Sequence, residues 1–306
     1  MSIFSVMRVY FDLTYIHPVP EGHKFPMEKY DLIPKQLLYE GVITEDQLIS
    51  PEMVAIEHVL KVHDEVYVQR LLECALTPRE QRVSGFVHSP ELIARELRIM
   101  EGTRLAAKYA YEHKSIALNV AGGTHHAYSS RAEGFCLLND QAIAAKWLLD
   151  TTSVEKVLII DLDVHQGNGT AEILQNRPEV FTFSMHGRNN YPLQKEQSDL
   201  DIPLEDGCDD VTFLNLLKTS LQQIENQFTP DFIFYQCGVD ILSTDALGKL
   251  GVTQQGCLER DSMVFEFAKK LDVPVVCSMG GGYSKDIRHI VDAHVNTYRV
   301  ASDSFM

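Results

Sequence analysis

VLIIDLDVHQGNG, residues 157–169, joins a strand-forming run to a group of polar side chains. Residues 157–160 are all apolar, without polar alternation, which is typical of a parallel strand covered on both faces. Asp161, Asp163 and His165 follow at alternate positions, and alternate side chains of an extended segment point the same way. Two carboxylates and an imidazole beside a buried strand cost free energy unless a cation shares their charge. The stretch therefore predicts a metal site at the end of a parallel strand.

Similar apolar runs recur along the chain, mostly followed by a glycine-containing turn and then by helical periodicity. The predicted strands cover 7–11, 116–120, 157–160, 181–185, 232–237 and 273–279. Helical patterns cover 27–40, 90–113, 141–149, 212–228 and 255–271. This alternation predicts an α/β protein of three layers, α/β/α, with a mostly parallel sheet flanked by helices on both faces. No repeat, low-complexity tract or linker interrupts the chain, so we expect a single domain over 1–306.

The composition limits the class of partner. The chain has 306 residues, 45% of them hydrophobic, and a formal net charge of −16. That balance argues against direct nucleic-acid binding, which needs a basic patch. The six cysteines are scattered without a CxxC pair, which favours a reducing compartment. The amino-terminal sequence lacks a leader pattern and no run reaches transmembrane length, so we expect a cytoplasmic protein without a membrane span.

Polar or glycine-rich segments follow one predicted strand after another. His125 and His126 follow the strand at 116–120, and Asp240 follows the strand at 232–237. A glycine run ending in Tyr283 follows the strand at 273–279. Because parallel α/β sheets bind ligands at the carboxyl ends of their strands, we expect these groups to gather at one edge.

The donor types narrow the choice of metal. Asp163, His165 and Asp240 offer two carboxylates and one imidazole, which leaves room for water, as in an open catalytic site. No cysteine is among these candidate ligands, which excludes a thiolate zinc site. Zn²⁺ and Fe²⁺ both suit such mixed ligation, Mn²⁺ is an alternative, and Ca²⁺ or Mg²⁺ would favour more oxygens.

Taken together, the motifs resemble the zinc-dependent histone deacetylase family of the arginase–deacetylase superfamily. The residues that carry the resemblance are GTHHAYSSRAEGFC (123–136), DLDVHQGNG (161–169), GVDIL (238–242), DALGKL (245–250) and SMGGGY (278–283). The HQGNG variant and the Tyr191-Pro192 pair resemble most closely the class IV branch. The resemblance implies hydrolysis of N-acyl-lysine amides and, for class IV, removal of long-chain fatty-acyl groups. Its partners would be acylated lysine peptides or proteins.

The resemblance also implies roles for the catalytic residues. Asp163, His165 and Asp240 would hold zinc, which activates water and polarises the amide carbonyl. His125 and His126 would act as general base and general acid. Tyr283 would donate its hydroxyl to the oxyanion.

For substrate and structural-ion binding the resemblance implies further positions. Phe135 and Tyr191 would form the walls of a tunnel, with Leu247 near its base. The Gly134 carbonyl would accept the substrate amide proton, and Gly282 would belong to the glycine loop that admits Tyr283. Asp161 would support His125 and would bind a potassium ion together with the carbonyls of Asp163, His165 and Met185 and the Ser184 hydroxyl.

Two departures from class I enzymes affect these expectations. Class I has an aspartate where this chain has Asn168, and a neutral amide is expected to hold His126 less cationic. The division of acid and base roles between His125 and His126 therefore stays open. The acidic rim residue that grips the substrate backbone in class I has no counterpart around 82–88.

Other functions are compatible with parts of this pattern. A small-molecule amidohydrolase of the same family would act on acetylated polyamines or similar amine metabolites. An arginase-like enzyme would need further metal-binding carboxylates near Asp240, and GVDILSTD does not place one at the family spacing. A non-catalytic acyl-lysine binder would not need all the catalytic positions filled. Tyr283, Phe135 and Tyr191 taken alone are also compatible with core packing, and the sequence does not indicate an oligomeric state.

Overall fold

The computed structural model describes residues 7–305, and within them a parallel sheet of eight strands forms the centre of the molecule. The expected absence of an amino-terminal leader concerns residues 1–6 among others, and these six residues lie outside the described part of the chain. The strands are β1 (Arg8–Tyr10), β2 (Leu48–Ile49), β3 (Ile116–Asn119), β4 (Val157–Asp161), β5 (Val180–Gly187), β6 (Leu200–Leu204), β7 (Phe232–Gln236) and β8 (Val275–Ser278). Their order is β2-β1-β3-β8-β7-β4-β5-β6.

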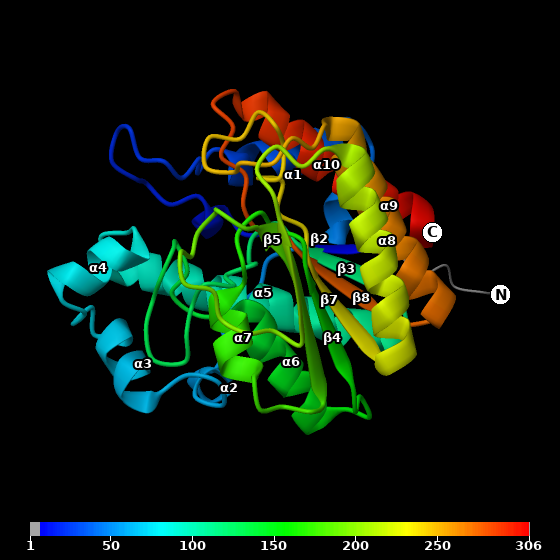
Figure 1. Cartoon of the computed structure of the whole chain (residues 1–306). Coiled ribbons are helices and arrows are strands. Elements are labelled where there is room, and N and C mark those ends of the chain that lie inside the picture. Colours follow the sequence, from blue (N-terminus) through cyan, green and yellow to red (C-terminus); the bar gives the residue numbers. More distant parts are fainter. Residues whose placement is uncertain (1–6, 306) are drawn as a thin grey trace.

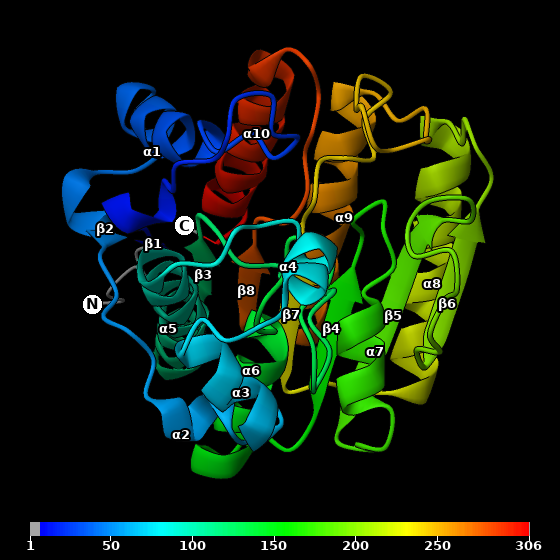
Figure 2. The same ribbon diagram turned by 90° about the vertical axis from the view of Figure 1, so that its left-hand side faces the viewer.

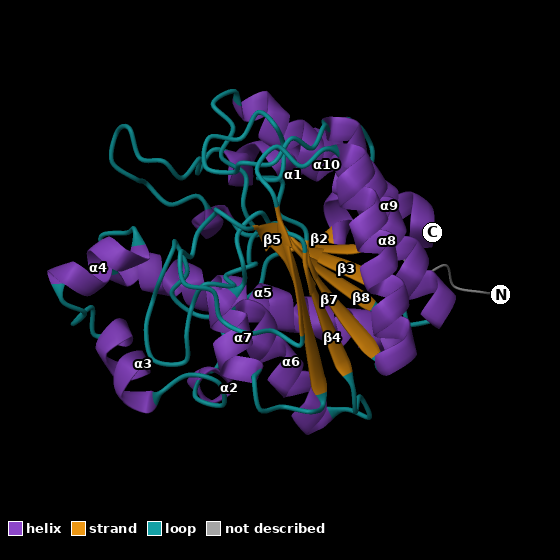
Figure 3. Cartoon of the chain, viewed as in Figure 1, coloured by secondary structure: helices purple, strands orange, loops and turns teal. Residues whose placement is uncertain are grey.

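Helices cover both faces of this sheet, as Figure 3 shows. One layer contains α5 (Pro90–His113), α6 (Asp140–Thr151) and α7 (Asn168–Leu174). The opposite layer contains α1 (Lys29–Tyr39), α8 (Asp210–Gln227), α9 (Gln254–Leu271) and α10 (Ile287–Phe305). Three short helices, α2 (Ile56–Val59), α3 (Glu65–Leu72) and α4 (Pro78–Ser84), lie outside the α5–α7 layer (Figures 1 and 2). The predicted three-layer α/β/α fold is confirmed.

The central strand β4 is buried on both faces, as its apolar run predicts. Val157 and Ile159 pack in the core that contains the alanines of α5 and α6. Leu158 and Ile160 point the other way, into the larger core that includes residues of α8, α9 and α10. Alternate residues of one strand therefore stabilise two separate helix layers. Within the described residues, no helix has the length and apolarity needed to cross a bilayer.

Some elements were not predicted. Strand β2 has two residues, and β6 is a partly exposed edge strand that contains Pro203, so neither presents a long apolar run. Helix α10 buries His294, Thr297 and Ser302 together with its apolar residues, which interrupts the apolar period. Helix α7 begins at Asn168, where the sequence suggested only a turn.

The extended alternation expected over 161–165 is wrong, because β4 ends at Asp161. The Asp161 carboxylate accepts the Asp163 amide at 3.2 Å, and the Asp163 carboxylate accepts the His165 amide at 3.0 Å. Such side-chain-to-backbone bonds favour a turn over a continuing strand. The three polar groups still gather, but a turning loop rather than a pleat brings them together.

Strand order places distant segments side by side. Strand β7 pairs with β4 on one side and with β8 on the other, and β5 pairs with β4. Asp161 is in register with Ser184 of β5 and with Gln236 of β7. The loops that follow these strands therefore meet at the carboxyl edge of the sheet, above β4, β5 and β7 in Figure 1.

Arg260 of α9 stabilises this edge from below. Its guanidinium is fully buried, pairs with Asp261 at 2.9 Å, and donates to the carbonyls of Leu162, Cys237 and Gly238. These carbonyls belong to the loops that carry the candidate metal ligands.

We predict that Arg260→Met destabilises the fold by about 3–5 kcal/mol, because Asp261 becomes a buried unpaired charge and the carbonyls lose their donor. Urea unfolding of the two proteins measures the change, and a loss below about 1 kcal/mol would contradict it. Arg260→Met combined with Asp261→Asn is expected to recover part of the loss, because it removes the unpaired charge.

Candidate metal centre and active site

Asp163, His165 and Asp240 form a buried cluster at the carboxyl edge, with one potential ligand atom from each lying within 4.8 Å of the others. Backbone amides orient the two carboxylates. Gly281 N–H donates to Asp163 Oδ2 at 2.8 Å, and Val164 N–H donates to Asp240 Oδ1 at 2.9 Å. Within the described chain, this is the one group of His, Cys, Asp and Glu side chains with metal-binding geometry.

The cluster fits a divalent cation. His165 Nδ1 lies 3.1 Å from both Asp163 Oδ1 and Asp240 Oδ2, so both carboxylates share one imidazole. Burial disfavours the charged imidazole, but the two carboxylates outweigh it and raise the pKa of His165 to about 10. Burial, followed by repulsion from Asp163, raises the pKa of Asp240 to about 7. A cation bound by these three atoms would neutralise the carboxylates and release the His165 proton, and the mixed N/O donor set suits Zn²⁺ or Fe²⁺.

His125 and His126 lie next to this cluster, with their ring centroids 4.1 Å apart. His125 Nδ1 donates to Asp161 Oδ2 at 2.7 Å, and His126 Nδ1 donates to Asn168 Oδ1 at 2.6 Å. Burial disfavours charge on both rings. The Asp161 and Asp163 carboxylates nevertheless raise the pKa of His125 to about 9, whereas burial and the neighbouring histidines hold the pKa of His126 well below its usual value. The two rings therefore differ in their tendency to carry a proton.

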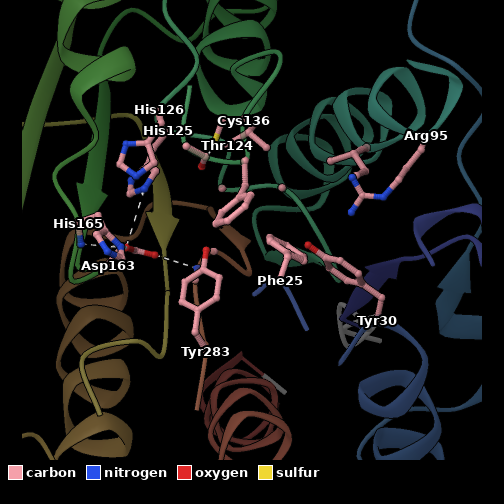
Figure 4. A pocket seen from close by; sticks show the side chains of 17 residues that line it. Phe25, Tyr30, Arg95, Thr124, His125, His126, Cys136, Asp163, His165 and Tyr283 are labelled. Carbon is pink, nitrogen blue, oxygen red and sulfur yellow. Dashed lines mark hydrogen bonds and ion pairs between the residues drawn. The ribbon is translucent and has the colours of Figure 1, made fainter. Parts of the chain in front are cut away.

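Tyr283 faces the histidines from the loop after β8. Its ring packs against those of Phe25, Phe135 and His165, with centroids 6.0, 6.1 and 6.4 Å away. Its amide donates to Asp245 Oδ2 at 2.6 Å, which fixes the loop. Figure 4 shows its hydroxyl directed into the cavity. Burial, with repulsion from nearby carboxylates, raises its pKa well above the usual value, so the hydroxyl remains a proton donor.

These side chains enclose a cavity of about 40 Å³ that is continuous in its lining with an outer mouth of about 340 Å³. The residues common to both linings are His126, Gly134, Phe135, His165 and Tyr283. Of the candidate metal ligands, His165 therefore lies where the mouth meets the inner cavity, Asp163 lines the inner cavity, and Asp240 lies behind them, outside both linings.

The predicted substrate residues differ in which part of the cavity they line. Gly134 and Phe135 line both the mouth and the inner cavity. Tyr191 lines the mouth only, donates its hydroxyl to Glu133, and packs edge-on against His126 at 5.0 Å.

Two of the predicted positions need correction. Leu247 lies at the mouth, not near the base of the tunnel, because Asp245 holds its amide in a turn at the outer surface. Gly282 is not among the cavity-lining residues, since a Cβ atom at this position would point towards Val239 and Ile290, while Gly280 and Gly281 line the cavity.

The residues expected to bind potassium lie behind the candidate centre, on β4, β5 and the loop after β4. Asp161 and Ser184 are in register on neighbouring strands, and Met185 follows Ser184. Ser184 Oγ is hydrogen-bonded to His186 Nδ1 at 2.9 Å, which gives His186 a partner that sequence reasoning did not assign. The buried oxygen-rich donors are of the type that hard cations prefer.

Lys29 was missed by sequence reasoning. It is fully buried, donates from Nζ to the Gly280 carbonyl at 3.0 Å, and lies 5.0–5.7 Å from the ring centroids of Phe25, Tyr30 and Tyr283. Burial lowers its pKa to about 8 against the opposing attraction of nearby carboxylates. Because lysines are rarely buried and its partner lies 251 residues away, no local signal identified it.

Lys29 gives a testable dependence of stability on pH. Its folded pKa of about 8 lies below the ordinary 10.5, so the folded protein binds fewer protons than the unfolded chain between these values. Wild-type stability, measured relative to Lys29→Met, is therefore expected to rise from pH 8 to 10.5, by roughly 3 kcal/mol in total. Urea unfolding at several pH values provides the comparison, and parallel profiles for the two proteins would contradict it.

Asp140 was missed for a different reason. It is the first residue of α6, where an acidic residue is ordinarily explained by the helix dipole. Its buried carboxylate instead accepts the amides of Gly123 and Thr124 at 3.1 and 2.9 Å, together with hydroxyls of Thr103 and Ser278. It thereby fixes the loop that carries His125 and His126.

Comparison with known proteins agrees with this site and fold. Residues 23–298 match the model of the histone deacetylase domain. The chain therefore belongs to the histone deacetylase family and is a hydrolase of the deacetylase type.

Particular relatives extend the match over nearly the whole chain. An uncharacterized protein of Picosynechococcus sp. is 42% identical over 95% of this chain and 97% of its own length. Histone deacetylase 2 of Arabidopsis thaliana is 30% identical over 88% of this chain and 72% of its own. A crystal structure of an HDAC homolog complexed with SAHA superposes with a TM-score of 0.85 at 25% identity, covering 97% of this chain and 84% of that one.

Proposed function

We propose that this protein is a lysine deacylase that hydrolyses N-acyl-lysine amides with the help of a divalent metal, zinc in preference to Fe²⁺. The observation that supports the proposal is the arrangement around one cavity: three buried ligands, two histidines in different environments and a tyrosine hydroxyl. The metal would be held by Asp163, His165 and Asp240, and it would supply Lewis-acid polarisation of the amide carbonyl and activation of water.

The protein groups have separate roles in this proposal. His126 is the ring held uncharged, so it accepts the proton of the attacking water and passes it to the leaving amine. His125, paired with Asp161, stays positively charged and stabilises developing negative charge. Asn168 orients His126 through its side-chain oxygen, and Tyr283 donates to the oxyanion.

The mouth residues would bind the rest of the substrate. Phe135 and Tyr191 would flank the alkyl stem of the lysine, and the Gly134 carbonyl would accept its amide proton. We further propose a structural potassium ion bound by Asp161, Asp163, His165, Ser184 and Met185. A cytoplasmic location is supported by the free cysteines in the described residues.

We extend the proposal to long-chain acyl groups, which the class IV resemblance implies. The inner cavity of about 40 Å³ corresponds to about three water-sized volumes, which suits an acetyl group. We expect a longer chain to separate the packed rings of Phe25, Phe86 and Phe135, of which Phe25 and Phe135 line the cavity. This aromatic wall is therefore the part of the site that long acyl groups must displace.

Turnover of acetyl-, butyryl-, decanoyl- and myristoyl-lysine peptides by the zinc-loaded protein tests both the deacylase function and the long-chain preference. Hydrolysis of any of them supports the deacylase, and faster hydrolysis of the two long chains supports the extension. Faster hydrolysis of acetyl-lysine than of the two long-chain peptides would exclude the long-chain preference, but it would still support the deacylase function. Tight peptide binding without turnover would exclude the enzyme in favour of an acyl-lysine binding protein.

A second candidate is a small-molecule amidohydrolase that acts on acylated amine metabolites such as acetylpolyamines. The same catalytic residues would serve it, so the two functions differ only at the mouth. An arginase-like enzyme with paired manganese is less well supported, because the described residues supply one three-ligand group.

A further inference from the structure

The mouth of the active site has an electrostatic character opposite to that of the whole chain. The chain carries a formal charge of −16, yet no aspartate or glutamate is among the residues that line the mouth. Two lysines line it, Lys24 from the loop before α1 and Lys249 from the loop between β7 and α9. Both side chains are exposed, and neither forms an ion pair with a described residue.

The surroundings preserve this positive charge. Lys249 donates to the backbone carbonyl of Asn189 at 3.0 Å, which holds the ammonium at the rim without neutralising it. Glu133, the carboxylate hydrogen-bonded to Tyr191, is also paired with Arg131 at 3.2 Å. Lys24 also lines the neighbouring groove, which contains the carboxylates Glu21 and Glu28 and a further cation, Lys285. Because the two glutamates line the groove and not the mouth, a substrate that enters the mouth meets Lys24 and Lys249 before it meets a carboxylate.

We propose that Lys24 and Lys249 are specificity-determining residues that favour acylated lysines flanked by carboxylate side chains and disfavour cationic acylamines. The proposal rests on the deacylase function above and names its substrate class. A peptide that carries Asp or Glu beside the acyl-lysine places a carboxylate at the rim. An acetylated polyamine brings one or more ammonium groups to the same place.

The expected preference is moderate because the lysines are exposed. Each favourable or unfavourable charge pair at a solvent-exposed rim changes affinity by about two- to fivefold. Two lysines acting together therefore give about a tenfold ratio of kcat/KM between acidic and basic flanking residues at low salt. The ratio is expected to shrink as salt rises, since the screening length falls from about 10 Å at 0.1 M to about 3 Å at 1 M.

The test uses the zinc-loaded protein and three peptides that differ only beside the acyl-lysine, where they carry glutamate, glutamine or lysine. The expected kcat/KM is highest for the glutamate peptide, lower for the glutamine peptide and lower again for the lysine peptide, with N-acetylputrescine the poorest substrate. In high salt the kcat/KM values of the three peptides are expected to converge. Lys24→Glu combined with Lys249→Glu is expected to reverse the order. Lys269→Glu is the matched control, because this exposed lysine lies in the last turn of α9, far from the loops that form the mouth.

Equal kcat/KM values for the three peptides would overturn the proposal. A reversed order of the peptides in the Lys269→Glu control would overturn it too. A preference of the wild-type protein for N-acetylputrescine would also overturn it. In each of these cases acyl-lysine hydrolysis itself is still observed. Failure of the deacylase function appears differently, as absence of turnover with every peptide.

Discussion

Asp240→Asn is expected to lower acyl-lysine hydrolysis by roughly a thousandfold or more, because a bound metal supplies several kcal/mol of transition-state stabilisation. The variant is also expected to lose most of its bound zinc. Without zinc its thermal stability at pH 8 should equal or exceed that of the wild type. Burial and Asp163 raise the pKa of Asp240 to about 7, so the ionised carboxylate destabilises the unloaded fold above that pH, and a neutral amide removes this cost.

Three measurements check this expectation: zinc content per chain, melting temperature with and without zinc, and kcat/KM. The wild type should gain stability with added zinc, and the variant should gain little. Asp292→Asn is the control, since Asp292 is exposed on α10. If the variant keeps the wild-type zinc content and at least one tenth of the wild-type kcat/KM, Asp240 is not a metal ligand.

Tyr283→Phe is expected to lower kcat by about 100- to 1000-fold, the usual effect of removing one oxyanion donor. Zinc content and melting temperature should hardly change, because the ring keeps its contacts with Phe25, Phe135 and His165. The Tyr283 amide keeps its hydrogen bond to Asp245 as well. The loss should therefore appear in kcat with little change in KM.

Tyr39→Phe provides the matched control, because Tyr39 is 87% exposed at the end of α1. Steady-state kinetics with one acyl-lysine peptide compare the two variants. If Tyr283→Phe retains more than a tenth of wild-type kcat, the hydroxyl has no role at the oxyanion.

The sequence predicted the sheet well where strands lie in its interior. Runs such as 157–160 and 232–237 are buried on both faces, so their composition alone identifies them. Edge strand β6 alternates poorly and contains Pro203, and α10 buries His294 and Thr297, so in both the local pattern conflicts with the tertiary environment.

The residues of the candidate site that belong to the strand-end motifs were predictable from the sequence. Asp163, His165 and Asp240 lie together as the strand-end argument requires. Lys29 and Arg260 act on backbone carbonyls far away in the sequence, and such contacts leave no local pattern. The position of Leu247 at the rim likewise depends on how Asp245 turns the chain, which composition does not encode.

In the proposed metalloenzyme, the separation of the candidate ligands along the chain also determines when a metal can bind during synthesis. His165 and Asp240 are 75 residues apart, and the Gly281 amide that orients Asp163 comes 118 residues after that aspartate. The ligand set of the nascent chain is therefore incomplete until Asp240 has been added after β7, and Asp163 lacks its orienting amide until translation has passed β8. Metal capture becomes a late event, and the choice among competing ions falls to the assembled sheet and not to a short peptide segment.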